Sequence, residues 1–192
     1  MYVQTEETPN PNTLKFLPGK TVSEVGPIEF TAKEQTENKL IQDILSMKEI
    51  NMVFLGADFI TVKKADQILW KEIKPKIISL INEYYLKDNV SVLDKNYLKQ
   101  KSNDEEPSDE VVKKIIDILD EKIRPAVARD GGDIKFKSFD NGLVTVELQG
   151  SCSGCPSSIM TLKQGVQNLL CHYVSEVKRV EAVQDNELID AR

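Results

Sequence analysis

Apolar residues recur at helical and strand spacing through the second half of the chain. One broad apolar face runs over residues 111–127, which predicts a helix. Ser108 is the expected N-cap, followed by two acidic residues that suit the helix dipole. The helix should end at residues 130–132, because the Asp-Gly-Gly run there accepts the left-handed conformation of a C-cap. Pro125 is expected to tighten or kink its last turn.

Alternating apolar positions then predict a hairpin. Ile134 and Phe136 alternate with lysines, and residues 144–148 alternate in the same way. Asn141-Gly142 lies between them and is the strongest short hairpin signal. A helical stripe follows over residues 159–173, and residues 177–183 form a last strand. The predicted order is α-β-β-α-β, with a right-handed crossover from the second strand to the third.

The first half of the chain gives a second set of elements. Short strands are predicted at residues 14–17 and, less regularly, 22–30, and a helix over 40–45. Residues 50–55 and 59–63 predict a hairpin, and residues 73–85 another helix with Pro75 in its first turn. The fold class is therefore α+β, built from two small domains.

A polar stretch separates the two sets of elements. Residues 89–107 contain few apolar positions, and residues 99–107 contain none, so that stretch is too polar to bury. The predicted organisation is a first domain over residues 1–88, a linker over 89–107 and a second domain over 108–192. The acidic run in the linker favours a solvated hinge over a docking segment.

Composition and charge exclude several classes of function. The chain has 192 residues, 40% of them apolar, and a net charge of −6. No apolar stretch approaches the roughly 18 residues that span a bilayer. The lysines are scattered among acidic residues instead of forming a basic face, so nucleic-acid binding is not expected. Residues 1–7 lack a basic or apolar leader, so we expect a cytosolic protein or a mature organellar one.

Candidate chemistry concentrates in one loop, in the run Gly-Ser-Cys-Ser-Gly-Cys-Pro-Ser-Ser. Cys152 and Cys155 form a C-x-x-C between the second strand and the helix that follows. Pro156 is favoured at the first position of a helix, where the partial positive charge favours thiolate over thiol. Gly150 and Gly154 allow backbone conformations closed to other residues, and would let amides point at sulfur.

The C-x-x-C alone is compatible with several kinds of chemistry. A thiol–disulfide oxidoreductase needs only these two cysteines, whereas a metal or cluster site needs about four ligands, which two copies of the loop would provide. The remaining alternative is that the two cysteines are ordinary reduced thiols without a functional role. Cys171 points away from the apolar stripe of its helix, so we expect it and His172 to be exposed and not ligands. No nucleophile–base pair and no phosphate-binding glycine loop is visible.

Several motifs together carry a family resemblance. They are residues 123–133 (IRPAVARDGGD), 150–158 (GSCSGCPSS) and 161–163 (TLK) in the second half, and 7–16 (ETPNPNTLKF) and 53–64 (VFLGADFITVKK) in the first. The chain resembles the Nfu-type iron–sulfur carriers, with an Nfu N-terminal domain and a NifU C-terminal domain. The cysteine-loop motif is highly specific, whereas the N-terminal motif says little about chemistry.

The resemblance implies a function. It implies a labile [4Fe-4S] cluster held between two chains by Cys152 and Cys155 of each, in a homodimer that exists when the cluster is bound. It implies delivery of that cluster to client apo-proteins, supply by upstream cluster-assembly proteins, and no enzymatic turnover. The implied location is the bacterial cytoplasm, or the mitochondrial matrix after removal of a presequence. The alternatives are a C-x-x-C thiol–disulfide oxidoreductase and a zinc-bridged structural dimer.

Overall fold

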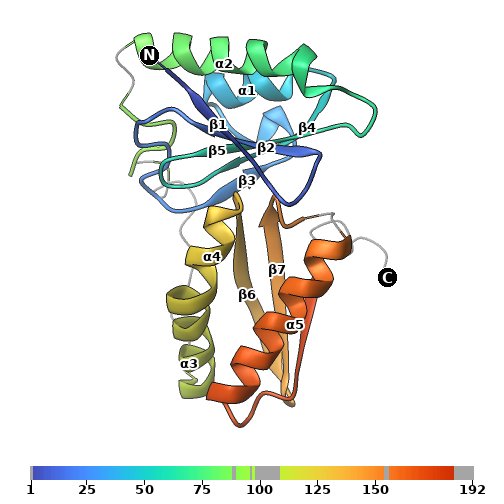
Figure 1. The fold of residues 1–192 in the computed structure, drawn as a ribbon. Helices are drawn as coiled ribbons and strands as arrows, with labels where there is room; N and C mark the ends of the chain where they lie inside the picture. Colours follow the sequence, from blue (N-terminus) through green and yellow to red (C-terminus); the bar gives the residue numbers. More distant parts are fainter. Residues whose placement is uncertain (1, 88–89, 96, 98–108, 154–155, 184–192) are drawn as a thin grey trace. The chain divides into compact units, whose positions relative to one another are not determined.

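The computed structural model describes residues 2–87, 90–95, 97, 109–153 and 156–183. The chain divides into two compact units, Met1–Asn103 and Asp104–Arg192. Both combine helices with a sheet, so the predicted α+β class with two domains is confirmed (Figure 1). Among the described residues, no helix combines the length and apolarity needed to cross a bilayer. The predicted linker boundaries at 89 and 107 stay predictions.

The first unit is an antiparallel sheet with two helices against it. The sheet has the order β1-β2-β5-β4-β3. The strands are β1 (Gln4–Glu7), β2 (Thr13–Leu17), β3 (Ile28–Phe30), β4 (Ile50–Leu55) and β5 (Ile60–Lys64), and the helices are α1 (Lys39–Leu45) and α2 (Trp70–Leu86), with a short 3-10 turn η1 (Lys33–Gln35). The predicted hairpin is β4–β5, closed by a hydrogen bond from the Gly56 amide to the Phe59 carbonyl at 2.9 Å.

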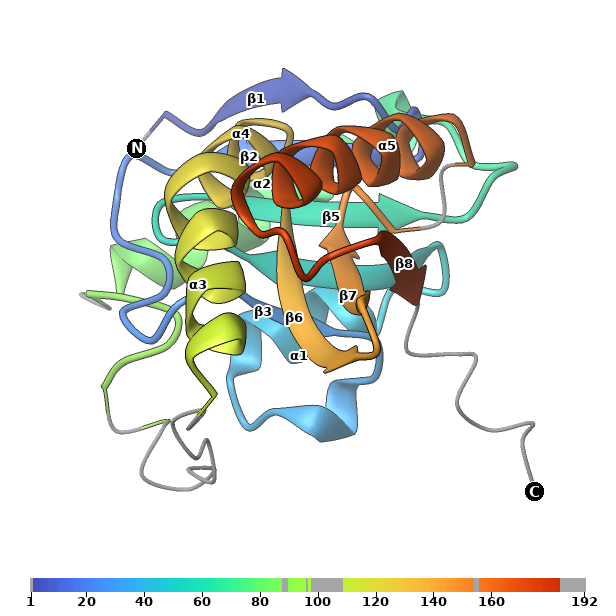
Figure 2. The same cartoon turned by 90° about the horizontal axis from the view of Figure 1, so that it is seen from below.

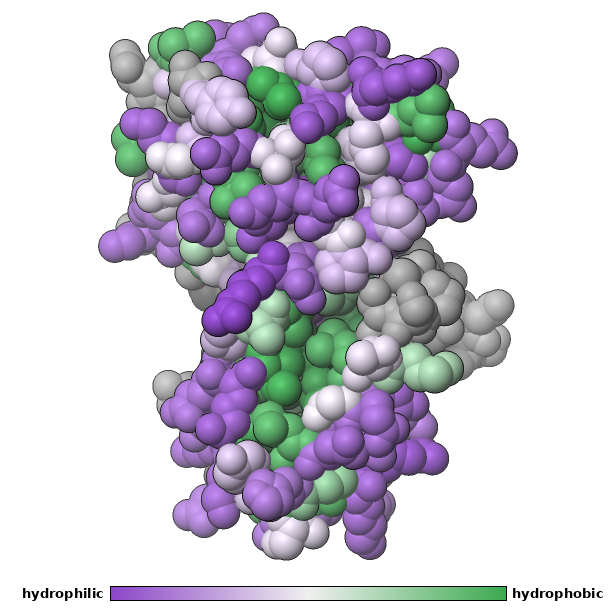
Figure 3. Space-filling view, viewed as in Figure 1, coloured by the Kyte–Doolittle hydropathy of each residue, from purple (hydrophilic) through white to green (hydrophobic). Residues whose placement is uncertain are grey.

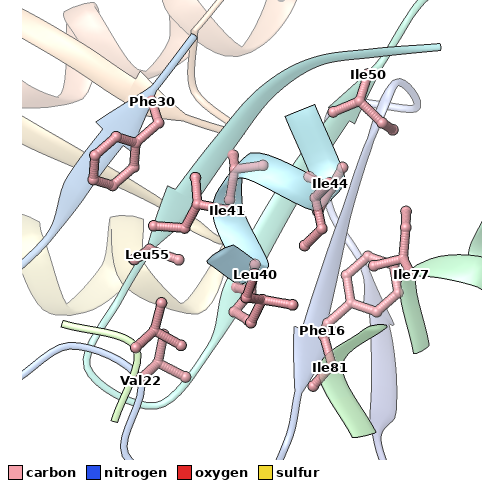
Figure 4. Close-up of a cluster of buried hydrophobic side chains, with 14 of the residues drawn as sticks. Phe16, Val22, Phe30, Leu40, Ile41, Ile44, Ile50, Leu55, Ile77 and Ile81 are labelled. Carbon is pink, nitrogen blue, oxygen red and sulfur yellow. The ribbon is translucent and has the colours of Figure 1, made fainter. Parts of the chain in front are cut away.

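The core of this unit forms because α1 presents one apolar face to the sheet. Leu40, Ile41 and Ile44 lie at the predicted spacing and are at most 3% exposed. Figure 4 shows them in the middle of the cluster, between Phe30 and Leu55 on one side and residues of β2 and α2 on the other. Asn38 caps α1, accepting hydrogen bonds from the amides of Leu40 and Ile41.

Two expectations for this unit are corrected, and one strand was not predicted. Residues 22–30 are not one strand: only β3 is extended, and Gly26 has a φ of 92°. Pro75 does not lie in the first helical turn, because α2 begins five residues earlier at Trp70 and contains the proline in its interior. Strand β1 was not anticipated, since its burial pattern is almost wholly exposed and carries no apolar alternation.

The segment after α2 returns to the first unit. The amides of Val92 and Leu93 donate to the Val22 carbonyl at 2.8 and 3.0 Å, and the Glu24 amide donates to the Leu93 carbonyl at 2.9 Å. Both apolar side chains are buried, at 5% and 3% exposure. The first unit therefore contains part of the stretch whose composition favours a linker.

The second unit is a three-stranded sheet covered by helices (Figures 1 and 2). Its elements are α3 (Glu110–Ile118), η3 (Leu119–Ile123), α4 (Arg124–Arg129), β6 (Gly132–Asp140), β7 (Leu143–Gly150), α5 (Pro156–Tyr173) and β8 (Arg179–Val183). β6 and β7 are antiparallel, and α5 leads to β8, which is parallel to β7. The predicted Asn-Gly turn is confirmed, with φ of 49° at Asn141 and 88° at Gly142.

The first helix of this unit differs from the prediction at its N-cap and in the turn before Pro125. Asp109, not Ser108, is the N-cap, and its carboxylate accepts from the Val111 amide at 2.8 Å. The helix is also interrupted by η3, one stretch of π-helix, where the Arg124 amide donates to the Leu119 carbonyl. Pro125 has no N–H to give to the carbonyl four residues back, so the turn before it widens. Of the two expected effects, tightening is wrong and a kink stays a prediction.

Apolar residues from α3, α4, α5 and the inward face of the sheet form one core. Its centre is fully buried at Ile115, Val144 and Leu170. Partly buried apolar side chains surround it, and in the space-filling view some of them are visible between α4 and α5 (Figure 3). The cysteine loop follows β7, so this core fixes the strand and the helix on either side of it.

Candidate metal centre

The loop that carries the first cysteine is fastened to the turn after α4. β7 ends at Gly150, whose φ of 66° confirms the expected left-handed conformation. The Ser151 amide donates to the Gly131 carbonyl at 3.2 Å, and the Ser151 hydroxyl donates to the carbonyl of Asp130. The Ser153 hydroxyl closes the loop on the Gly150 carbonyl at 2.8 Å. The residues that end α4 therefore also position the cysteine loop.

Cys152 lies against the core, and its side chain is only 7% exposed. The sulfur of Cys152 lies next to Gly132, the first residue of β6. A Cβ on Gly132 would lie 2.8 Å from the Cys152 sulfur and 2.6 Å from the Gln149 carbonyl oxygen. The Ser151 hydroxyl lies 3.9 Å from the same sulfur. The sulfur thus occupies the space that a side chain at residue 132 would need.

A charged pair holds the start of β6 next to this contact. Arg124 donates to both carboxylate oxygens of Asp133, from Nε at 2.9 Å and from Nη2 at 3.0 Å. Asp133 is 3% exposed, and Arg124 also donates to Asp120 at 2.9 Å. The hydrogen bond to Asp133 is the largest effect on the guanidinium and raises the pKa of Arg124, with burial opposing it. A bidentate pair of this kind fixes direction as well as distance.

Buried polar side chains continue along β7. Gln149 donates from Nε2 to Glu147 at 2.7 Å, and Glu147 pairs with Lys137. Burial raises the pKa of Glu147, but hydrogen bonds from Lys137 and Gln149, with the charges of Lys137 and Lys135, outweigh it and lower the pKa. Within the described part of the chain, the Gln149 Oε1 is buried without a hydrogen-bond partner.

The structure describes only part of the expected site. Pro156 begins α5, as predicted. Cys155 and Gly154 lie outside the described residues, so the assignment of Cys152 and Cys155 as a ligand pair stays a prediction. Among the residues that are described, no group of three or more His, Cys, Asp or Glu side chains could hold a metal ion.

The two residues expected to lie away from the site do so. Cys171 is exposed at the other end of α5, as predicted. His172 is exposed too, with its ring edge-on to Tyr173 at 4.9 Å between centroids.

Sequence reasoning missed the residues that support the loop. Gly132 and Asp133 were used as a helix stop and as part of a motif, and Arg124 only as part of that motif. Their contact joins residues nine apart across a turn, which no periodicity shows. The sequence signal that could have indicated this contact is the pair of opposite charges, Arg124 and Asp133, on either side of Gly131.

Comparison with known proteins places both units. Residues 115–181 match the family described as NifU-like domain, and residues 3–88 match the one described as scaffold protein Nfu/NifU N terminal. NifU-like protein 4, mitochondrial, of Arabidopsis thaliana is 43% identical over 191 residues, which cover 97% of this chain and 68% of the relative. The NFU1 iron-sulfur cluster scaffold homolog, mitochondrial, of Homo sapiens is 42% identical over 189 residues, covering 97% and 74%.

Among solved structures, a NifU-like protein from Saccharomyces cerevisiae is 29% identical and covers 50% of this chain and 86% of its own, with a TM-score of 0.45. The two family models and the relatives matched over 97% of this chain show the family. The chain belongs to the Nfu/NifU family of scaffold proteins.

Proposed function

We propose that this chain is an iron–sulfur cluster scaffold and carrier. It binds a labile [4Fe-4S] cluster and transfers it to apo-proteins, without catalytic turnover of its own. Membership of the Nfu/NifU family supports the cluster as cargo, because a relative over nearly the whole chain is named an iron-sulfur cluster scaffold homolog. The observation that carries the proposal is the position of Cys152, held in a fastened loop between β7 and α5.

The ligands we assign are Cys152 and Cys155 of each of two chains. A [4Fe-4S] cluster is held by about four thiolates. The chain has three cysteines, and Cys171 is exposed at the far end of α5 from the loop. One chain therefore supplies two ligands, and a second copy supplies the other two. Cluster binding then stabilises the dimer by mass action.

Shared ligation also explains transfer. Each chain contributes half of the ligands, so an incoming client thiolate can replace one chain's pair at a time. The start of α5 at Pro156 places free backbone N–H groups beside the loop, which favours the thiolate form that binds iron. We assign recognition of clients or upstream donors to the first unit.

The burial of Cys152 disfavours this residue as the attacking thiol of a dithiol enzyme. A thiol that attacks disulfides is at least partly exposed, whereas Cys152 is 7% exposed and packed with the core. We place the protein in the mitochondrial matrix, the second of the two expected locations, because relatives over 97% of the chain are named as mitochondrial.

The test is anaerobic reconstitution with iron and sulfide of the wild type and of three single variants. One shared cubane predicts about two iron and two sulfide ions per chain. Cys152→Ala and Cys155→Ala should each lose the cluster, and Cys171→Ala should retain it. Iron retention in Cys155→Ala equal to the wild type would contradict the ligand assignment. Tightly bound zinc without sulfide would support a structural dimer instead, and a colourless monomer that reduces disulfides would support an oxidoreductase.

A further inference from the structure

The outer face of α5 differs in composition from the other helix surfaces. No exposed residue that the structure describes on α5 is Asp, Glu, Lys or Arg: the exposed residues are Met160, Thr161, Gln164, Gly165, Asn168, Cys171, His172 and Tyr173. On α3, in the same unit, every exposed residue is charged: Glu110, Lys113, Lys114 and Asp117. Charged residues make up 29% of the whole chain, so their absence from one long helix face is a local feature.

Gly165 is the second unusual feature of this face. It lies in the interior of α5, where glycine is less stable than alanine. A Cβ at Gly165 would meet nothing within 4 Å. Packing within the chain therefore does not require a glycine there. A glycine that destabilises its helix, and that packing within the chain does not require, is expected where a second backbone must approach closely.

We propose that the face of α5 formed by Met160, Thr161, Gln164, Gly165 and Asn168 is the surface on which a second copy of this chain packs when the cluster is bound. This inference rests on the proposed function, because the cluster is what brings the two copies together. The occupant follows from the ligand shortage. Two loops that share one cluster must lie within a few ångströms of each other, and α5 starts directly after the loop in both copies.

Symmetry explains why the face lacks charge. In a two-fold dimer the residues closest to the symmetry axis meet their own copies, so a charge there faces a like charge from the partner. Amide side chains, by contrast, both donate and accept and can pair with a second copy of themselves. Gln164 and Asn168 already show this pairing within one helix, with Nε2 donating to Oδ1 at 3.0 Å. From Met160 to Asn168 the face spans roughly 12 Å of helix, so the protein contact is small and the cluster supplies most of the stability.

Opposite charges placed on the face give a direct test. Asn168→Lys and Asn168→Glu would each put like charges together in a homodimer. Ser138→Lys is the matched control, because it adds the same charge to an exposed position on β6 of the same unit. The dimer dissociation constant is measured anaerobically on cluster-loaded protein by sedimentation, with iron content recorded in parallel. Melting of each apo variant establishes that it is folded.

We expect each Asn168 variant alone to dissociate at least tenfold more readily than the wild type and Ser138→Lys. An equimolar mixture of Asn168→Lys and Asn168→Glu should recover dimer as a mixed species. Dimerisation of both variants and their mixture at wild-type strength would overturn the inference while leaving the proposed function intact. The same holds if Asn168→Lys leaves the dimer unchanged but slows transfer to an apo-client. Failure of the wild type to bind iron and sulfide would instead overturn the proposed function itself.

Discussion

Gly132→Ala tests whether the first cysteine is positioned by a close contact with the start of β6. The new Cβ would lie 2.6 Å from the Gln149 carbonyl oxygen, 2.8 Å from the Cys152 sulfur and 3.2 Å from the Cys152 amide nitrogen. Two of these atoms are backbone, and Gly132 pairs with Gly150 at the end of the hairpin, so neither strand can retreat cheaply. The φ of Gly132 is not left-handed, so the cost is one of space alone. Overpacking of this kind costs about 1–3 kcal/mol.

That cost is measurable in two independent ways. For a domain of this size it corresponds to a fall in melting temperature of roughly 5–20 °C. Because one of the contacts is the sulfur, iron and sulfide binding on anaerobic reconstitution should fall as well. Gly165→Ala is the matched control for stability: its Cβ meets nothing within 4 Å, so the apo protein should melt at the wild-type temperature or slightly higher. Unchanged melting and unchanged iron content in Gly132→Ala would refute the packing argument.

Three further changes test the support of the site and the division of the chain. Asp133→Asn should destabilise the second unit by about 1.5–3 kcal/mol in chemical denaturation, because it weakens the two hydrogen bonds that the partly buried Arg124 guanidinium donates to Asp133. Denaturation at the wild-type midpoint would show that this pair does not stabilise the unit. The pKa of Glu147 is lower in the folded protein than its ordinary value of 4.5, so the carboxylate stabilises the fold above pH 4.5 and this stabilisation is lost as the pH falls through the lowered pKa. Glu147→Gln should therefore flatten the acid side of a curve of unfolding free energy against pH. Parallel curves for the variant and the wild type would contradict this role. Cleavage between residues 99 and 107 should leave two soluble pieces, the piece from residue 108 onward still binding iron and sulfide, and loss of its circular dichroism signal would place the domain boundary elsewhere.

Local signals predicted the elements whose stability depends on neighbours in sequence. The Asn-Gly turn was predictable because both of its residues need positive φ, and few other residues tolerate that. The apolar spacing of α1 and α5 was equally informative, since a helix face must be buried. The exposure of Cys171 followed from the same angular argument.

Features set by distant contacts were not predictable. Strand β1 exists because its backbone pairs with β2, and the two strands are also joined by the 3.3 Å ion pair between Glu6 and Lys15. The π turn depends on where the missing N–H of Pro125 falls relative to the helix that precedes it. The burial of Cys152 depends on the absence of a side chain at Gly132, twenty residues earlier. The strand and the buried cysteine depend on relations between separate segments, and the π turn depends on hydrogen-bond geometry that periodicity does not show.

The packing of Tyr97 on the first unit limits the length of the connection to the second unit. The Tyr97 amide donates to the Asp94 carbonyl at 3.1 Å, and its ring lies edge-on to Phe30 at 6.4 Å between centroids, whereas the described part of the second unit begins at the N-cap Asp109. The tether between Tyr97 and Asp109 therefore has a contour length of at most roughly 43 Å. A client bound to the first unit would meet the cluster at an effective concentration in the millimolar range, far above free protein in solution. Shortening this tether would raise the encounter rate until the two surfaces no longer reached each other, and transfer would then stop abruptly.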